Sequence, residues 1–354
     1  MTLKSRKIIL LSIIFLLIGL IAYALEAHVD RKELLQAVKP LKVRFAPLPE
    51  VAQNPNNPIT EAKVHLGKML YMDPRLSKNH DVSCNSCHHL DKFGVDGLPT
   101  SPGHRGQLGE RNSPTVYNSA LQFKQFWDGR AEDVEEQALG PILNPIEMAM
   151  PDEDQVLKVL NSIPEYQKSF RKAFPNEKQP LTYKNVGRAI AAFERTLITP
   201  SRFDRFLNGD DYALTDLELE GLNTFATVGC TTCHNNVGIG GNSFQKLGLV
   251  KPFKTKDMGR FQVTKVEADK FLFKPPSLRN VAKTGPYFHD GSVKNLEEAI
   301  KLMGKHQLGI KLKKNQIKAI RAFLNSLTGE IPEYALKPID LPASTADTPK
   351  PDPT

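Results

Sequence analysis

Cysteine is scarce in this chain, and none is left over for a structural disulfide bond. The 354 residues contain four cysteines. All four belong to two copies of one motif, Cys84-Asn-Ser-Cys87-His88 and Cys230-Thr-Thr-Cys233-His234. A framework of disulfide bonds is therefore excluded, and the two motifs decide what the cysteines do.

Long runs of basic residues are also lacking. The formal net charge is +8, but Lys4, Arg6 and Lys7 supply three of the positive charges and precede the globular part. This mild bias gives little support to nucleic-acid binding, so we expect no nucleic-acid partner. Hydrophobic residues make up 40% of the chain and charged residues 24%, which is ordinary for a globular protein with a core.

The chain has one long apolar run, Ile8 to Ala24, which contains no charged residue. It follows the three basic residues and ends in Ala22-Tyr23-Ala24, the small-x-small pattern that signal peptidase accepts. This pattern favours a signal peptide over residues 1–24. A retained membrane anchor is the alternative, because the run lies at the short edge of a bilayer span. In both cases we expect the globular part outside the cytoplasm, in the periplasm.

The two Cys-x-x-Cys-His motifs indicate covalent haem attachment. Two thiols at this spacing reach the two vinyl groups on one porphyrin edge, and the adjacent imidazole binds iron from one face. A zinc ribbon would place its cysteine pairs about 15–20 residues apart, whereas these pairs begin at residues 84 and 230. A thioredoxin-like site would need a βαβ context, which the sequence lacks. We therefore expect two c-type haems.

Alternating β-branched residues are rare, so the predicted fold is mainly α, with two c-type cytochrome-like haem domains in tandem. Thr215-Asp216-Leu217-Glu218 forms a capping box that predicts a helix running to Gly229, just before the second motif. Helical spacing of apolar residues predicts further helices over Ala62–Tyr71, Tyr183–Thr199, Leu296–Leu302 and Asn315–Leu327.

Composition divides the rest of the chain. Residues 25–58 are rich in proline and are expected to form a loosely structured extension. A first haem domain is expected over residues 59–200 and a second over residues 201–331. Residues 332–354 combine proline with Thr, Asp and Ser, and we expect a mobile tail there.

The sixth iron position decides whether such a haem carries electrons or performs chemistry. A haem iron whose sixth position is occupied by Met or His passes electrons, while one whose sixth position is vacant can bind peroxide. Seven histidines lie outside the two motifs and six methionines follow the initiator, and their pattern alone assigns no ligand.

The order of several sequence blocks resembles the bacterial di-haem cytochrome c peroxidases. The resemblance runs from about Ile59 to Leu327. Besides the two haem motifs, it is carried by residues 67–77 (GKMLYMDPRLS), 109–115 (GERNSPT), 126–130 (FWDGR), 144–148 (NPIEM), 203–206 (FDRF), 276–280 (PSLRN), 286–291 (PYFHDG) and 307–309 (QLG).

The resemblance implies that the first haem is the peroxidatic one, with His88 as its proximal ligand and His104 as a displaceable sixth ligand. It also implies that Glu147 is the acid/base in the peroxide pocket, with Gln137 beside it to hydrogen-bond peroxide. From the residues alone, the favoured interpretation of His104 is a solvated loop histidine. Glu147 could equally be a helix-start carboxylate after Pro145.

Trp127 is the sole tryptophan. The resemblance places it on the electron path between the two haems, while the residue alone indicates a buried aromatic anchor, and both can hold. For the second haem, the resemblance implies His234 and Met303 as iron ligands. Met258 is the competing methionine. Relatives that mature the quinone cofactor of methylamine dehydrogenase carry Tyr at the position of Met303, so Met argues against that activity.

The resemblance further implies a calcium site between the domains, formed by Asn112, Thr284 and Pro286, since calcium prefers oxygen ligands. It implies a periplasmic enzyme that reduces hydrogen peroxide with electrons from a small cytochrome c or cupredoxin, and that forms a homodimer. Two alternatives stay open: a di-haem electron carrier without peroxidase activity, and an oxidase acting on a protein or another organic substrate.

Overall fold

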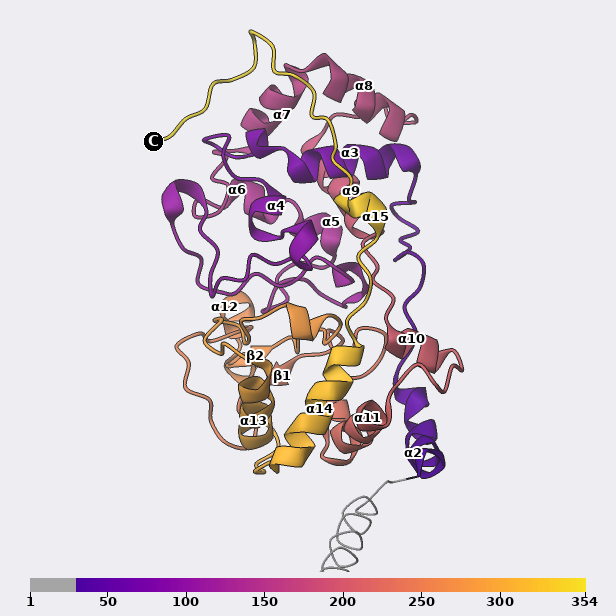
Figure 1. Ribbon diagram of the computed structural model, residues 1–354. Coiled ribbons are helices and arrows are strands. Elements are labelled where there is room, and N and C mark those ends of the chain that lie inside the picture. The colour runs from indigo at the N-terminus through magenta and orange to yellow at the C-terminus, as the bar shows by residue number, and fades with distance from the viewer. Residues whose placement is uncertain (1–29) are drawn as a thin grey trace, which may run out of the picture.

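The computed structural model describes residues 30–354 (Figure 1). The predicted leader, residues 1–24, lies outside the described residues. Within them, no helix is both long and apolar enough to cross a membrane. The mainly α prediction is confirmed: the strands are two short ones, β1 (Gln245–Lys246) and β2 (Leu272–Phe273), which pair antiparallel.

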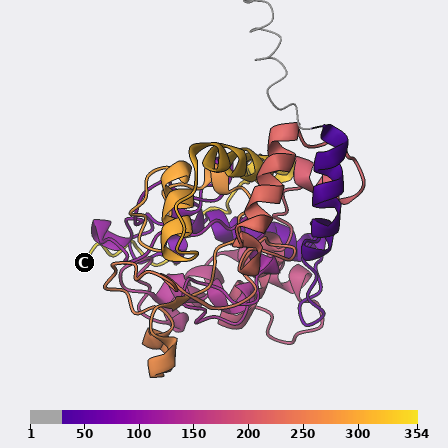
Figure 2. The same cartoon turned by 90° about the horizontal axis from the view of Figure 1, so that it is seen from below.

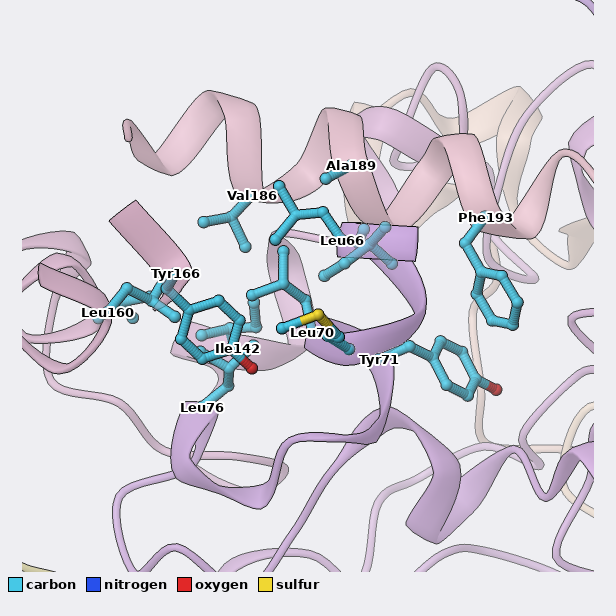
Figure 3. Packing of buried hydrophobic residues seen from close by; sticks show 14 of the residues in the cluster. Leu66, Leu70, Tyr71, Leu76, Ile142, Leu160, Tyr166, Val186, Ala189 and Phe193 are labelled. Carbon is cyan, nitrogen blue, oxygen red and sulfur yellow. The ribbon is translucent and has the colours of Figure 1, made fainter. Parts of the chain in front are cut away.

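The first lobe surrounds the first haem motif. Its α-helices are α3 (Glu61–Met72), α4 (Cys84–Cys87), α5 (Val134–Gln137), α6 (Gly140–Leu143), α7 (Glu153–Asn161), α8 (Pro164–Ala173) and α9 (Tyr183–Glu194). Figure 3 shows Leu66 and Leu70 of α3 packed toward Val186 and Ala189 of α9. All four side chains are fully buried, so this helix pair forms the centre of the lobe's core.

The second lobe surrounds the second motif. Its α-helices are α10 (Arg202–Leu207), α11 (Asp216–Thr227), α12 (Phe261–Thr264), α13 (Leu296–His306) and α14 (Lys314–Ser326). The predicted capping box at Thr215 is present, because its side chain accepts from the backbone N–H of Glu218. A second hydrophobic cluster, with Phe203, Leu222 and Phe323, fills this lobe.

Both lobes are built on the same close helix contact. In α3, a Cβ added at Gly67 would lie 1.9 Å from the carbonyl oxygen of Ala189 on α9. In α11, a Cβ added at Gly221 would lie 2.0 Å from the carbonyl oxygen of Ala319 on α14. Any side chain at these positions would force the helices apart, so glycine sets their separation.

The segment expected to be a loose extension instead contains a helix, α2 (Arg31–Val38). Leu34 and Val38 are buried in the second lobe, and Figure 2 shows α2 alongside α11. Phe45 packs edge-on against Phe203, with ring centroids 5.3 Å apart. The proline content therefore marks turns around this helix rather than a loose chain.

The structure also differs from the expectation of a mobile tail. After α14 the chain crosses to the first lobe, where α15 (Glu333–Leu336) lies near α3 and α9 (Figure 1). The buried Lys68 ammonium donates to the carbonyl of Lys337 at 2.6 Å, and Thr345 donates to the carbonyl of Ser162 at 2.9 Å. Composition does not predict this ordered segment, because several of its hydrogen bonds are accepted by backbone carbonyls, which every residue type carries.

Substituting Gly221→Ala tests the helix contact. We expect the added methyl group to lower the free energy of unfolding by about 1–3 kcal/mol, the usual cost of overpacking a core. Gly109→Ala is the matched control, since a Cβ there meets nothing within 4 Å. Urea unfolding of the holoprotein measures both; equal midpoints for the two variants would contradict the contact.

Candidate active site

The first motif lies on a short, capped helix. The hydroxyl of Ser86 accepts from the backbone N–H of Ser83 at 3.0 Å, which fixes the start of α4. His88 follows at its end, and its Nδ1 donates to the carbonyl of Gly94 at 3.4 Å. That bond leaves Nε2 free to bind a metal and fixes the ring's orientation. We call the cavity lined by Cys84, Cys87 and His88, about 450 Å³ in volume, the first cavity.

The second motif has the same arrangement. His234 donates from Nδ1 to the carbonyl of Ile239 at 3.2 Å. Cys230, Cys233 and His234 line a cavity of about 180 Å³, the second cavity. Met303 of α13 lines it as well, whereas Met258 does not. The geometry therefore favours Met303 over Met258 as the predicted axial partner.

The chemistry of the motif residues fits haem. Burial raises the pKa of Cys87 to about 11 and of Cys230 to about 12, so both thiols are neutral while they are free. Burial lowers the pKa of His234 to about 4, which keeps its imidazole neutral and able to bind iron. His289 lines the second cavity, and its buried Nδ1 has no hydrogen-bond partner among the described residues. A bound group that carries a carboxylate would supply the missing hydrogen-bond partner.

Glu147 and Gln137 lie together on the wall of the first cavity. The Glu147 carboxylate accepts a hydrogen bond from Nδ2 of Asn144 at 2.9 Å. Burial raises the pKa of Glu147, an effect that the Arg130 charge and the Asn144 hydrogen bond partly offset. A carboxyl with a raised pKa beside an iron-binding cavity is suited to proton transfer. The structure thus brings these two predicted residues to one place.

His104 is buried, with 5% of its surface exposed, so it is not the solvated loop histidine that the residues alone favoured. Its backbone N–H donates to the carbonyl of Glu147 at 2.7 Å. However, the ring does not line the first cavity. Its Nε2 lies 3.2 Å from the carbonyl oxygen of Thr354, in the segment beyond α15. Its role as the sixth ligand therefore stays a prediction.

Trp127 lies where the two lobes meet. It lines the first cavity, the second cavity and a smaller third one of about 70 Å³, the bridging cavity. Its indole Nε1 donates to the carbonyl of Asn112 at 2.9 Å, so its buried polar atom is satisfied. A single side chain thus contacts both predicted haem sites, which fits a place on the path between them.

The three predicted calcium ligands, Asn112, Thr284 and Pro286, all line the bridging cavity. Asn112 donates from Nδ2 to the carbonyl of Leu98 at 2.9 Å, which leaves its Oδ1 as an acceptor for a cation. Among residues 30–354, no cluster of three or more His, Cys, Asp or Glu could hold a metal. No Asp or Glu side chain lines the bridging cavity, so a cation there would bind through neutral oxygens, as the prediction states.

Two residues that line these cavities were not predicted from the sequence. Glu194 of α9 lines the first cavity, and burial raises its pKa to about 8. It lies four residues after Ile190, on the apolar face of its helix, and this placement could have revealed it. Lys274 lines the second and bridging cavities. It follows β2 outside any periodic helix, so no pattern marks it as buried.

Comparison with known proteins decides the family. Residues 61–212 match the family model described as di-haem cytochrome c peroxidase. The chain is 48% identical to cytochrome c551 peroxidase of Pseudomonas aeruginosa over 316 residues, 87% of this chain and 90% of that protein. The chain belongs to the di-haem cytochrome c peroxidase family. The resemblance inferred from the ordered sequence blocks is thereby confirmed.

Other di-haem cytochrome c peroxidase relatives agree. Cytochrome c551 peroxidase of Nitrosomonas europaea is 46% identical over 341 residues, 96% of this chain and 98% of that protein. A solved MauG-like protein associated with microbial copper homeostasis matches with a TM-score of 0.72 and 29% identity, covering 80% of this chain and 94% of that one. The predicted fold, the two c-type haems and the classification as an enzyme are confirmed.

Replacing Met303 tests the axial assignment. In the haem-loaded Met303→Ala variant, we expect loss of the near-infrared absorption of a methionine-bound ferric haem, because the thioether is removed. Met258→Ala is the control, and it should keep the band since Met258 does not line the second cavity. Retention of the band in Met303→Ala together with its loss in Met258→Ala would reverse the assignment.

Proposed function

We propose that this protein is a periplasmic enzyme that reduces hydrogen peroxide to water with electrons from a small carrier, a monohaem cytochrome c or a cupredoxin. The observation that carries the proposal is the contrast between the two cavities. The first holds the buried, ionisable Glu147 beside Gln137, whereas the second contains Met303 in a largely apolar lining. One cavity is thus suited to chemistry on a small polar substrate and the other to electron transfer.

The bound haem irons would supply the redox chemistry, held by His88 in the first cavity and by His234 and Met303 in the second. The chain's own residues handle the protons. Glu147 accepts the proton from one peroxide oxygen and returns it to the other, which leaves as water. The Gln137 amide donates to peroxide and orients it.

The loop that carries His104 would control access to the first cavity. Gly103 packs against the backbone of Glu147, where a Cβ would lie 2.1 Å from the carbonyl of Ile146. Arg105 has a φ of 58°, a left-handed conformation that non-glycine residues rarely adopt. With its ring bonded to Thr354, His104 leaves the first cavity free for peroxide. Movement of this loop would bring the ring back as the sixth ligand.

The electron donor would dock beside the second cavity. Leu249, Val250 and Ile310 are exposed apolar side chains, and each lies within three residues along the chain of Leu247 or Leu308, which line this cavity. The Gln307 side chain holds this surface together, because its Oε1 accepts from the N–H of Gly248 at 2.6 Å and of Leu249 at 3.0 Å. Exposed lysines adjoin this patch along the chain: Lys246, Lys251, Lys305 and Lys311. An apolar patch with basic neighbours suits a small acidic carrier.

The two alternatives explain less of the structure. A pure electron carrier has no use for the ionisable Glu147 and the polar Gln137 on the wall of the first cavity. An oxidase of the quinone-maturing kind is expected to carry Tyr where Met303 stands.

The calcium site would couple the lobes through the bridging cavity, beside Trp127. A homodimer remains a prediction from the sequence, and so does the signal peptide, with a retained anchor as its alternative.

Glu147→Gln tests the proton step. We expect peroxide turnover to fall by about 10²–10⁴-fold, the usual contribution of a positioned acid/base, with both haems still attached. Glu153→Gln, on the nearby helix α7 but outside the first cavity, is the control and should keep full turnover. Unchanged turnover in Glu147→Gln, measured by oxidation of reduced cytochrome c, would refute the mechanism.

The pH dependence follows from the same carboxyl. Glu147 must be ionised to accept the first proton, and burial raises its pKa, so activity should fall with decreasing pH at a higher pH than an ordinary glutamate would give. Because the Arg130 charge lowers this pKa, Arg130→Gln should move the acidic limb of the pH–rate profile upward. A limb that moves downward, or stays in place, would contradict the assignment of Glu147.

Reversing charge at the docking surface tests the donor site. In a Lys251→Glu/Lys311→Glu variant, we expect KM for an acidic cytochrome c to rise about tenfold at low ionic strength, because electrostatic attraction is lost. The difference should shrink at high salt. Lys178→Glu, an exposed lysine of the first lobe, is the control. An equal KM in all three proteins would place the donor elsewhere.

A further inference from the structure

Lys274 is a buried lysine at the junction of the second and bridging cavities. It directly follows β2, and only 5% of its surface is exposed. Its backbone N–H donates to the carbonyl of Trp127 at 2.9 Å, so it is fixed to the residue that both lobes share. Its side chain lines the second and bridging cavities, but not the first.

The Lys274 ammonium lacks a counter-charge. Its one side-chain hydrogen bond goes to the neutral Oε1 of Gln122. Among the described residues, no carboxylate lies within salt-bridge distance of it. Burial alone lowers its pKa to about 7, and no acidic group opposes that effect. By comparison, the buried Lys68 ammonium is held by the carbonyls of Tyr334 and Lys337.

A buried ammonium is costly unless an anion pairs with it. The haem of the second cavity, attached at Cys230 and Cys233, carries two propionate groups. These propionates are the anions that the second cavity receives. We propose that Lys274 is the counter-cation for a propionate of the second haem, and that it holds this anionic edge beside Trp127. Lys274 is then a positioning residue that sets the charge around the electron-entry haem.

The charge of Lys274 would also act on the redox equilibrium of the second haem. A fixed positive charge near iron stabilises the reduced state, which carries one positive charge fewer. Lys274 would therefore raise the reduction potential of the second haem, as Met303 does by ligation. The inference rests on haem in the second cavity and not on the donor or on Glu147, so it fails separately from the proposed function.

The test is the reduction potential of the second haem in the haem-loaded protein, measured by equilibration with redox dyes. In Lys274→Met, which removes the charge and shortens the side chain by one atom, we expect the equilibrium to shift toward the oxidised haem by at least tenfold, about 59 mV for one electron. Lys274→Gln should show the same shift. Lys274→Arg, which keeps the charge, should stay within threefold of the wild type.

Lys68→Met is the matched control, since it removes a buried ammonium far along the chain from the second motif. It should leave the potential of the second haem unchanged. If Lys274→Met does not take up haem, the comparison of Lys274→Gln with Lys274→Arg decides. Equal potentials in these two variants, or a Lys274→Met potential equal to that of Lys68→Met, would overturn the inference.

Discussion

The structure depends on one close helix contact that occurs once in each lobe. Gly67 and Gly221 let their helices approach the backbones of Ala189 and Ala319, at distances that any side chain would prevent. The partner helices then supply cavity walls, with Ile190 and Glu194 of α9 in the first cavity and Ile320 and Leu324 of α14 in the second. The contact therefore places a helix wall in each haem cavity, and the proximal histidines are held the same way in both lobes.

From this common plan the two lobes diverge in chemistry. The first cavity has ionisable and polar groups on its wall, and burial keeps the Glu147 carboxyl at a raised pKa. The second is mostly apolar, and its polar lining consists of His234, Lys274, Tyr287, His289 and two glutamines besides the motif cysteines and Trp127. Trp127 is the shared element, bonded to the first lobe through Asn112 and to the second through Lys274. A di-haem peroxidase needs this asymmetry, because one iron must meet substrate while the other only exchanges electrons.

The features of the fold and of the site that depend on a short local sequence pattern could be predicted from the sequence. The haem motifs, the capping box at Thr215 and the helical class all follow from spacing along one segment. The extension and the tail could not be predicted, because α2 and Lys68 find their partners on distant parts of the chain. The buried Lys274 gave no pattern either. For His104 the resemblance predicted an iron ligand, while the structure shows its ring bonded to Thr354, so its role as a ligand stays a prediction.

The most direct test of the account is peroxide-dependent oxidation of reduced cytochrome c by the haem-loaded protein with calcium, before and after one-electron reduction. We propose that the oxidised holoprotein holds His104 on the first iron and that reduction of the second haem releases it to the position bonded to Thr354. The account therefore predicts turnover that rises sharply on partial reduction. No turnover in either state, with both haems intact by absorption spectrum, would contradict it and favour an electron carrier.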